Sequence, residues 1–272
     1  MRLEEGNSMV LPKKSRDPVS IALSIEEKVA SRSLHGKPLR RYYGFSHGSW
    51  YGGSFAGYTI GCNLNCAFCW AWFKNRFDLG IYLTPEEVAR RLVYGAIKTN
   101  AKVVRISGGE PTICIDHLLD VLKEFSRRST KIRLVIETNG VLLGHSGSLA
   151  SELGEFSEKN ISVRVSLKGA DSDTFSKLTG APREYFTYQL NSIENLIKAG
   201  FTPGRTLLVA VMSSFNKPRE IAELIYELSK IDYEIPKTVE LEIVKLYKNV
   251  RKKLDSVNLR PFTYIEPDSS RS

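Results

Sequence analysis

Three cysteines lie within eight residues of the sequence and could act together as metal ligands. Cys62, Cys66 and Cys69 fall in residues 61–70, which read Gly-Cys-Asn-Leu-Asn-Cys-Ala-Phe-Cys-Trp. Thiolates are the ligands that iron–sulfur clusters prefer, and three of them on one short loop can hold three irons of a [4Fe–4S] cluster. The fourth iron would be free to bind another molecule. The spacing therefore predicts a catalytic cluster rather than one that only carries electrons.

Zinc binding and chance burial are the two alternatives to a cluster at these cysteines. A zinc site normally combines two separated pairs of Cys or His ligands. The fourth cysteine is Cys114, and the four histidines form no paired motif. In the second alternative, the three cysteines are a chance group of buried side chains. We expect Cys114 to pack as a small buried side chain, because free cysteines are commonly buried.

The composition of the chain is that of a soluble globular protein. Of its 272 residues, 42% are hydrophobic and 25% are charged. No apolar run approaches the length of a membrane span, and the N-terminus lacks a secretory signal pattern. We therefore expect a cytoplasmic protein with no membrane partner. The formal net charge of +9 favours anionic partners, but the charge is spread along the chain and does not by itself indicate nucleic acid.

Strands and helices are expected to alternate from residue 58 onward. Thr84, Pro85 and Glu87 form a strong helix start, with an N-cap, a proline at the first helical position and a capping box. We expect strands at residues 58–60, 102–107, 132–138, 161–167, 205–212 and 238–246, and helices at residues 84–98, 115–127, 149–157, 171–199 and 218–231.

This alternation predicts parallel βαβ units with right-handed crossovers. Six units are too few for a closed eight-stranded barrel. The predicted fold class is therefore α/β, with a partial (β/α)6 barrel or an open doubly wound sheet as its architecture. We expect a core domain at residues 51–247, an irregular N-terminal extension at residues 1–50 and a C-terminal tail at residues 248–272.

Polar residues and glycines follow several of the predicted strands. In sheets of this kind, ligands bind at the carboxyl ends of the strands. The residues at these ends are Gly108, Gly109 and Glu110 after the second strand, Glu137 in the third, and Ser166 and Lys168 in the fourth. One site at this edge of the sheet is expected.

The chain resembles the radical S-adenosylmethionine (radical SAM) enzymes. Their first motif is Cys-x3-Cys-x2-Cys with an aromatic residue before the third cysteine, a place that Phe68 fills. Their second motif, Gly-Gly-Glu-Pro, stands at residues 108–111. The resemblance covers roughly residues 58–247.

The resemblance implies a role for each strand-end residue. Cys62, Cys66 and Cys69 would bind three irons, and the amino and carboxylate groups of SAM would bind the fourth. Gly108, Gly109 and Glu110 would contact the methionine ammonium of SAM, and Lys168 would contact its carboxylate. The backbone of Phe68 would contact the adenine, and Glu137 and Ser166 would lie near the ribose. Val209 and its neighbours would form an apolar wall against the adenine. The cofactors would produce a 5′-deoxyadenosyl radical that abstracts hydrogen from a substrate. A ferredoxin or flavodoxin type of protein would supply the electron.

The resemblance leaves the substrate open between a protein, an RNA and a small molecule. Residues 137–140 and 166–169 are similar to two stretches of the glycyl radical enzyme activases, which act on proteins. However, the Asp-Gly-Pro-Gly-x-Arg stretch of activases is absent, and residues 47–53 stand in its place. The basic residues 37–41 and 245–253 could contact RNA phosphates instead. A non-catalytic iron–sulfur or zinc binding module is the remaining alternative.

Overall fold

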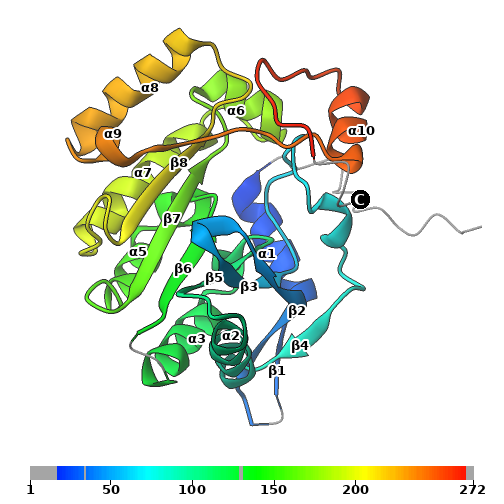
Figure 1. Cartoon of the computed structure of the whole chain (residues 1–272), viewed down its shortest axis with the longest axis vertical. Coiled ribbons are helices and arrows are strands. Elements are labelled where there is room, and N and C mark those ends of the chain that lie inside the picture. Colours follow the sequence, from blue (N-terminus) through cyan, green and yellow to red (C-terminus); the bar gives the residue numbers. More distant parts are fainter. Residues whose placement is uncertain (1–16, 34, 129–130, 268–272) are drawn as a thin grey trace, which may run out of the picture.

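A computed structural model of the chain describes residues 17–33, 35–128 and 131–267 and builds them around one nine-stranded sheet (Figure 1). Six strands run parallel and follow one another in sequence order. They are β3 (Ser54–Thr59), β5 (Val103–Gly108), β6 (Arg133–Thr138), β7 (Ile161–Leu167), β8 (Leu207–Met212) and β9 (Glu240–Glu242). The sheet order runs from β1 to β9 without closing. This confirms the predicted α/β class and partial barrel.

Three antiparallel strands extend the sheet on the N-terminal side. Helix α1 (Pro18–Val29) begins at its N-cap Asp17 and leads into β1 (Ala30–Arg32), which pairs with β2 (Pro38–Gly48). Strand β2 also pairs with β3 and with β4 (Ile81–Leu83). The described part of the N-terminal extension is therefore more regular than expected. Residues 1–16 and 268–272 of the two extensions lie outside the described residues.

The helices between the parallel strands form where local capping favours them. The Thr84 hydroxyl accepts the backbone N–H of Glu87 at 3.2 Å, and the Glu87 carboxylate accepts the N–H of Thr84 at 2.9 Å, which confirms the predicted start of α2. The larger crossover helices are α2 (Pro85–Thr99), α3 (Ile115–Arg128), α5 (Gly147–Gly154), α7 (Tyr185–Lys198) and α8 (Pro218–Ile231). Helix α6 (Ser172–Thr179) is as long as α5, and the shorter helical segments are η1 (Trp50–Gly52), η2 (Trp72–Lys74), η3 (Pro111–Cys114), α4 (Val141–His145) and α9 (Ile235–Thr238).

The helical region expected at residues 171–199 consists of two helices, α6 and α7. Gly180 follows α6 with a φ of +74°, a conformation that caps a helix, and Pro182 stands between the two helices. The helix expected at residues 149–157 corresponds to α5, and the short helix α4 before it, separated from α5 by the extended backbone of Ser146, was not predicted.

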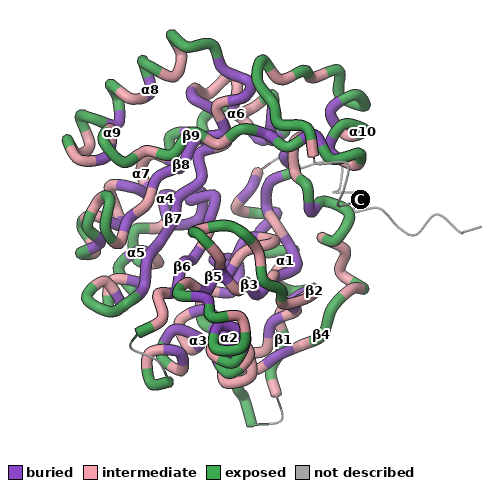
Figure 2. The backbone as a smooth tube through the Cα atoms, viewed as in Figure 1, coloured by how far each residue is buried: buried purple, intermediate pink, exposed green. Residues whose placement is uncertain are grey.

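The two faces of the parallel sheet differ in chemistry. Alternate residues on the helix-covered face, including Val163, Val165 and Val209, join the main hydrophobic core. The residues between them point to the opposite face, here called the inner face, because successive side chains of a strand alternate. Polar side chains such as those of Arg105 and Arg164 lie on that face. They are buried although they are charged, with exposed fractions of 5% and 6%. Figure 2 shows buried residues running along the central strands and exposed ones along the outer helices.

The C-terminal helix α10 (Lys248–Ser256) is part of the same fold. Its apolar residues Val250 and Leu254 join a small core with Ala67, Leu178 and Met212. Figure 1 shows α10 beside the segment that follows β3. The division into core and extensions stays a prediction. None of the helices in the described ranges has the length and apolar character needed to cross a membrane.

Candidate active site

The loop that carries the three cysteines begins at Gly61, directly after β3. Gly61 has a φ of +94°, and a Cβ at this position would lie 2.4 Å from the Ile25 side chain of α1. A glycine is therefore required here. The loop is held further along by hydrogen bonds to the end of α6, from the Ala67 N–H to the Leu178 carbonyl at 2.7 Å and from the Asn65 N–H at 3.2 Å to Thr179.

Cys62, Cys66 and Cys69 all project from this loop as free thiols, with Cys66 buried and the other two partly buried. Burial raises the pKa of the Cys62 thiol above its usual range. It also raises the pKa of the Cys66 thiol, to about 11, although the nearby ammonium groups of Lys168 and Lys253 act to lower it. Within the three described ranges, no three His, Cys, Asp or Glu side chains are gathered closely enough to hold a metal ion.

The chemistry of this donor set fits an iron–sulfur cluster. Three soft thiol ligands share one short loop, and two cations lie close enough to offset the negative charge of thiolates. Cys114 does not join them. It is buried among Ile21, Ile25 and Ile60, and its sulfur contacts the Arg40 guanidinium. This confirms the expectation that Cys114 is buried, and it leaves three cysteines rather than four on the loop.

The glycine turn after β5 touches the cysteine loop directly. The Glu110 N–H donates to the Gly61 carbonyl at 2.7 Å, and the Gly109 N–H donates to the Thr59 carbonyl at 2.8 Å. A Cβ on Gly109 would lie 2.2 Å from the Gly61 oxygen, and Gly108 has a φ of +93°. Both glycines are therefore needed so that the two strand ends can approach each other.

The Glu110 carboxylate is 2% exposed and holds the ends of β5 and β6 together. Its Oε1 accepts the hydroxyls of Thr112 and Thr138, both at 2.7 Å, and its Oε2 accepts the backbone N–H of Asn139 at 2.7 Å. The Thr112 N–H also reaches Oε1, at 3.2 Å. A carboxylate oxygen has two acceptor positions, so Oε2 keeps capacity for one further donor such as an ammonium group.

The structure adds Asn139 and Gln189 to the candidate site, and the sequence analysis gave neither of them a role there. The Asn139 side-chain amide donates to the Asn63 Oδ1 at 2.8 Å and lies 4.0 Å from the Cys62 sulfur. Gln189 on α7 donates to the Asn139 carbonyl and accepts the Lys168 N–H at 3.0 Å. Asn139 is followed by a glycine, and because Asn-Gly pairs are typical of turns, the sequence alone predicted only a turn at this position. Gln189 is the only glutamine of the chain and is fully buried.

Glu137 lies on the inner face and is already paired. Arg105 on β5 donates to both of its carboxylate oxygens at 3.0 Å, and the Tyr51 hydroxyl lies 3.4 Å from Oε1. Glu137 stands opposite Arg164 in the register of β6 and β7, so both side chains point to the same face. The structure thus brings Glu137 to the inner face as part of an ion pair.

Ser166 and Lys168 continue this polar face toward the cysteine loop. The Lys168 ammonium donates to the Ser166 hydroxyl at 2.7 Å, which in turn donates to Glu242 at 3.1 Å. Arg164 pairs with Glu242 at 2.8 Å and with Glu240 at 2.6 Å. Burial opposes the ionisation of Glu242, but the charges of Arg164 and Lys168 outweigh it and lower the pKa of this carboxyl group.

Val209 is not brought to the inner face. It is 3% exposed and packs in the main core with the helices. The residue of β8 that stands beside Ser166 in the sheet is Ala210. The Val209 side chain therefore lies on the wrong face to form an apolar wall there. Phe68 is placed on the cysteine loop, with its ring 5.9 Å from that of Phe215.

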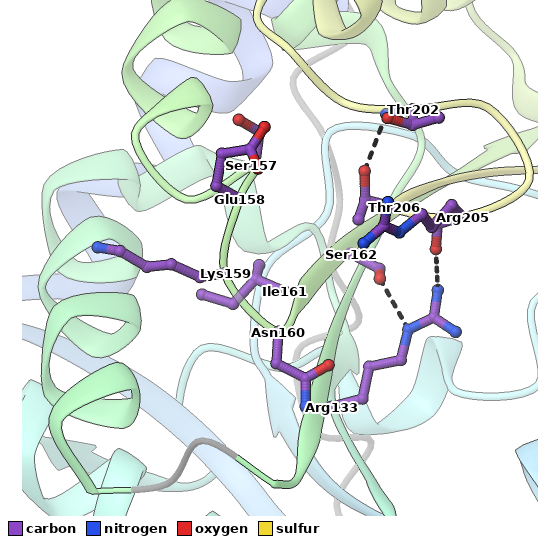
Figure 3. Close-up of a pocket in the computed structure, with 10 residues that line it drawn as sticks. All are labelled: Arg133, Ser157, Glu158, Lys159, Asn160, Ile161, Ser162, Thr202, Arg205 and Thr206. Carbon is purple, nitrogen blue, oxygen red and sulfur yellow. Dashed lines mark hydrogen bonds between the residues drawn. The ribbon is translucent and has the colours of Figure 1, made fainter.

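A polar pocket at the opposite end of the strands contains none of the predicted site residues (Figure 3). It lies where β6, β7 and β8 begin. Arg133 donates to the Ser162 hydroxyl at 2.8 Å, and the Thr202 N–H donates to the Thr206 hydroxyl at 2.8 Å. Because ligands of parallel α/β sheets bind at the carboxyl ends of the strands, we treat this pocket as separate from the candidate site.

The model of the Radical SAM superfamily matches residues 58–228, a stretch that contains both the cysteine loop and the glycine turn. The chain belongs to the radical SAM superfamily. It is 26% identical over 215 residues to a probable GTP 3′,8-cyclase of Methanococcus aeolicus, which covers 75% of this chain and 68% of the relative. It is 32% identical over 208 residues to a probable GTP 3′,8-cyclase of Thermoplasma volcanium, which covers 72% of this chain and 57% of the relative.

A solved structure supports the fold. HydG, a maturase of the [FeFe]-hydrogenase, superimposes with a TM-score of 0.51 at 17% identity, over 73% of this chain and 47% of HydG. As a radical SAM protein, the chain is an enzyme that uses a [4Fe–4S] cluster and SAM and that needs a reductant. This favours an enzyme over a non-catalytic module and iron over zinc. The two relatives bear the name of cyclases, so the resemblance to activases gains no support from them.

Proposed function

We propose that this enzyme abstracts hydrogen from a polar small molecule that is held against the inner face of the partial barrel. The observation that carries the proposal is a run of polar contacts along the inner face that begins at Lys168, close to the cysteine loop. Lys168, whose charge acts on the Cys66 thiol, donates to Ser166, which donates to Glu242, which pairs with Arg164. A radical formed at the loop would therefore meet polar and charged groups.

The same geometry supports a set of proposed cofactor contacts. Cys62, Cys66 and Cys69 would bind three irons of the cluster, and the free acceptor position of Glu110 would take the SAM ammonium. Lys168 would take the SAM carboxylate. When bound, the cluster and SAM supply a 5′-deoxyadenosyl radical, while the residues of this chain orient the cofactor and exclude water.

The proposed contacts to the nucleoside half of SAM rest on placement alone. Phe68 would offer its backbone to the adenine. Glu137 and Ser166 would face the ribose, and Glu137 would do so while it stays paired with Arg105. We leave Val209 out of this site because its side chain packs with the helices.

GTP is the first substrate to test, because the two relatives described above are named as GTP cyclases. The chain spans 68% and 57% of their lengths, so their substrate comes to this protein only as a proposal. RNA is less well supported than it was on the sequence. Arg40, from the basic segment 37–41, is 1% exposed and cannot contact a phosphate. We further propose that the enzyme works in the cytoplasm, where its free thiols stay reduced.

The test of the cofactor site is anaerobic reconstitution followed by measurement of iron, sulfide and 5′-deoxyadenosine. Cys66→Ala should lose the cluster and the SAM cleavage. Cys114→Ala is the matched control, because this buried cysteine lies in another core, and it should keep both. A Cys66→Ala protein that still cleaves SAM would contradict the ligand assignment.

The substrate needs a separate measurement. We expect GTP to make the formation of 5′-deoxyadenosine faster than it is without a substrate. When the ribose of GTP carries deuterium, that deuterium should be transferred into the 5′-deoxyadenosine. ATP and a glycine-containing peptide serve as comparisons. If GTP gives neither effect while SAM is still cleaved, the substrate proposal fails and the cofactor site stands.

A further inference from the structure

Helix α10 presents a strongly basic surface. Residues 245–253 contain five basic residues and no acidic one, namely Lys245, Lys248, Arg251, Lys252 and Lys253. Lys248 and Lys252 are four residues apart, so they lie on the same side of the helix, and both are exposed. Arg251 is partly neutralised by Glu266 at 2.8 Å. Asp255 is exposed on the same side, three residues after Lys252, so the two lysines leave this side of α10 with a net charge of one positive unit.

Exposed aromatic side chains of the cysteine-loop segment adjoin this helix. Trp70 is 50% exposed, Trp72 38% and Phe73 42%. The rings of Trp72 and Phe73 are in edge-to-face contact at 6.2 Å, and the Lys253 ammonium of α10 lies 5.9 Å from the Trp72 ring. Exposed aromatic groups that adjoin one another in this way are typical of protein-binding sites. We call Lys248, Lys252, Trp70, Trp72 and Phe73 the α10 surface.

The α10 surface is built directly onto the loop of the cluster ligands. The Lys253 ammonium donates to the Cys66 carbonyl and to the Asn65 side chain, both at 2.8 Å. Asn249 donates to the Trp70 carbonyl at 2.7 Å, and the Trp72 indole N–H lies 3.4 Å from the Asn249 carbonyl. A protein bound at this surface would be separated from the cysteine loop by one layer of side chains.

We propose that the α10 surface is the docking site of an acidic electron-donor protein. The inference rests on the proposed place of the cluster on the cysteine loop. Opposite charge brings the donor to the basic helix, and the aromatic groups give it an apolar contact. In the electron transfer, the reduced centre of the donor loses one electron and the cluster gains it, and no bond is made or broken in that step. The protein already requires a reductant, so the donor adds no new reactant.

The position of this surface argues against RNA as its occupant. A substrate must bring its reacting C–H bond to the inner face, where Ser166, Lys168 and Glu242 lie. The α10 surface instead adjoins the ligand loop, where Asn249 contacts Trp70 and Trp72. A donor of electrons needs only to come close to the cluster, and it does not need to enter the site.

The test compares two double charge reversals. Lys248→Glu/Lys252→Glu changes the α10 surface, while Arg90→Glu/Lys98→Glu makes the same change in charge on α2, where both residues are also exposed. Neither pair belongs to the proposed cofactor site. The probe is an acidic flavodoxin, and its binding to each reconstituted protein is measured by calorimetry at low and high salt.

We expect the α10 variant to lose about tenfold in flavodoxin affinity at low salt, with the difference from the parent shrinking at high salt. The flavodoxin concentration for half-maximal cluster reduction should rise to a similar extent. Reduction by a small photoexcited deazaflavin should stay unchanged, and the α2 variant should match the parent in every measurement.

Equal flavodoxin binding by the α10 variant and the parent would overturn the proposal, as would an equal loss in the α2 variant. Loss of tRNA binding in the α10 variant with flavodoxin binding unchanged would assign the surface to RNA instead. Failure to build a cluster would count against the proposed function, while the binding measurement can still be made on the protein without it.

Discussion

The Glu110 carboxylate accepts the backbone N–H of Asn139 at 2.7 Å and so joins the turns that follow β5 and β6. The same side chain is the proposed ligand of the SAM ammonium. Structural support and cofactor binding therefore meet in one carboxylate, and the two roles can be separated by experiment.

Glu110→Gln should weaken both folding and SAM binding. The new amide would present N–H groups to donors that now find an acceptor, at a cost of about 1–3 kcal/mol in the free energy of unfolding. Thr138→Val is the control, because it removes the hydroxyl that donates to the carboxylate and accepts the Gly140 N–H but leaves the charge of Glu110. It should cost about 1–3 kcal/mol and keep SAM affinity. Urea unfolding and calorimetry measure the two effects, and normal SAM binding by Glu110→Gln would disprove the ligand role.

Gly109→Ala should separate the glycine turn from the cysteine loop. Its methyl group would lie 2.2 Å from the Gly61 oxygen, so one of the two backbones must move. We expect a loss of about 1–3 kcal/mol, as for other overpacked sites, and a lower iron content after reconstitution. Gly44→Ala is the matched control, because its methyl group would meet no atom within 4 Å. Similar melting temperatures for the two variants would contradict the close approach.

Arg40→Met should destabilise the region behind the cysteine loop. The Arg40 guanidinium donates to the carbonyls of Ile60 at 2.8 Å and Glu110 at 3.1 Å, and without it both buried oxygens lose a donor. We expect a loss of about 2–4 kcal/mol in the free energy of unfolding. Arg41→Met at the adjacent, less buried position should cost clearly less. Equal unfolding midpoints in urea would show that the Arg40 hydrogen bonds are dispensable.

His117 should make the protein less stable in mild acid. Burial is the main cause that lowers its pKa to about 4, against an ordinary value near 6.5. Between these two values the unfolded chain binds more protons than the folded one, so stability falls as the pH falls. From pH 7.5 to pH 5 this group should remove about 2 kcal/mol.

Substitution His117→Gln isolates the effect of this histidine from that of the other acidic and basic groups. Urea unfolding of the parent and the variant without cluster, at several pH values, gives the two stability curves. The curve of the variant should be flatter between pH 6.5 and pH 4. Parallel curves would show that His117 is not held neutral in the folded protein.

Much of the site could be predicted because its determinants are local in sequence. The spacing of Cys62, Cys66 and Cys69 is read directly, and the parallel strands bring Gly108 and Glu110 to the same edge as the cysteine loop. The parallel strands themselves follow from the alternation of apolar runs with helix starts. These features need no knowledge of which side chains meet.

Contacts between distant residues could not be predicted in this way. Arg40 belongs to a basic segment and looked like a surface residue, but it is buried because its hydrogen-bond partners, the carbonyls of Ile60 and Glu110, lie just beyond β3 and β5. The pairing of Arg105 with Glu137 is equally long-range, although a lone arginine amid apolar strand residues could have indicated an inner polar face. In α10, the basic residues concealed the two apolar positions, Val250 and Leu254, that pack against the core.

The Gly61 carbonyl accepts the Glu110 N–H, and it also limits what can stand at position 109. The structures of the two sequence motifs therefore depend on each other, although nearly forty residues separate them in the chain. If the cysteine loop were transferred into another member of the superfamily, its glycine turn would have to be transferred together with it. In protein engineering, the pair is the smallest exchangeable part of this site.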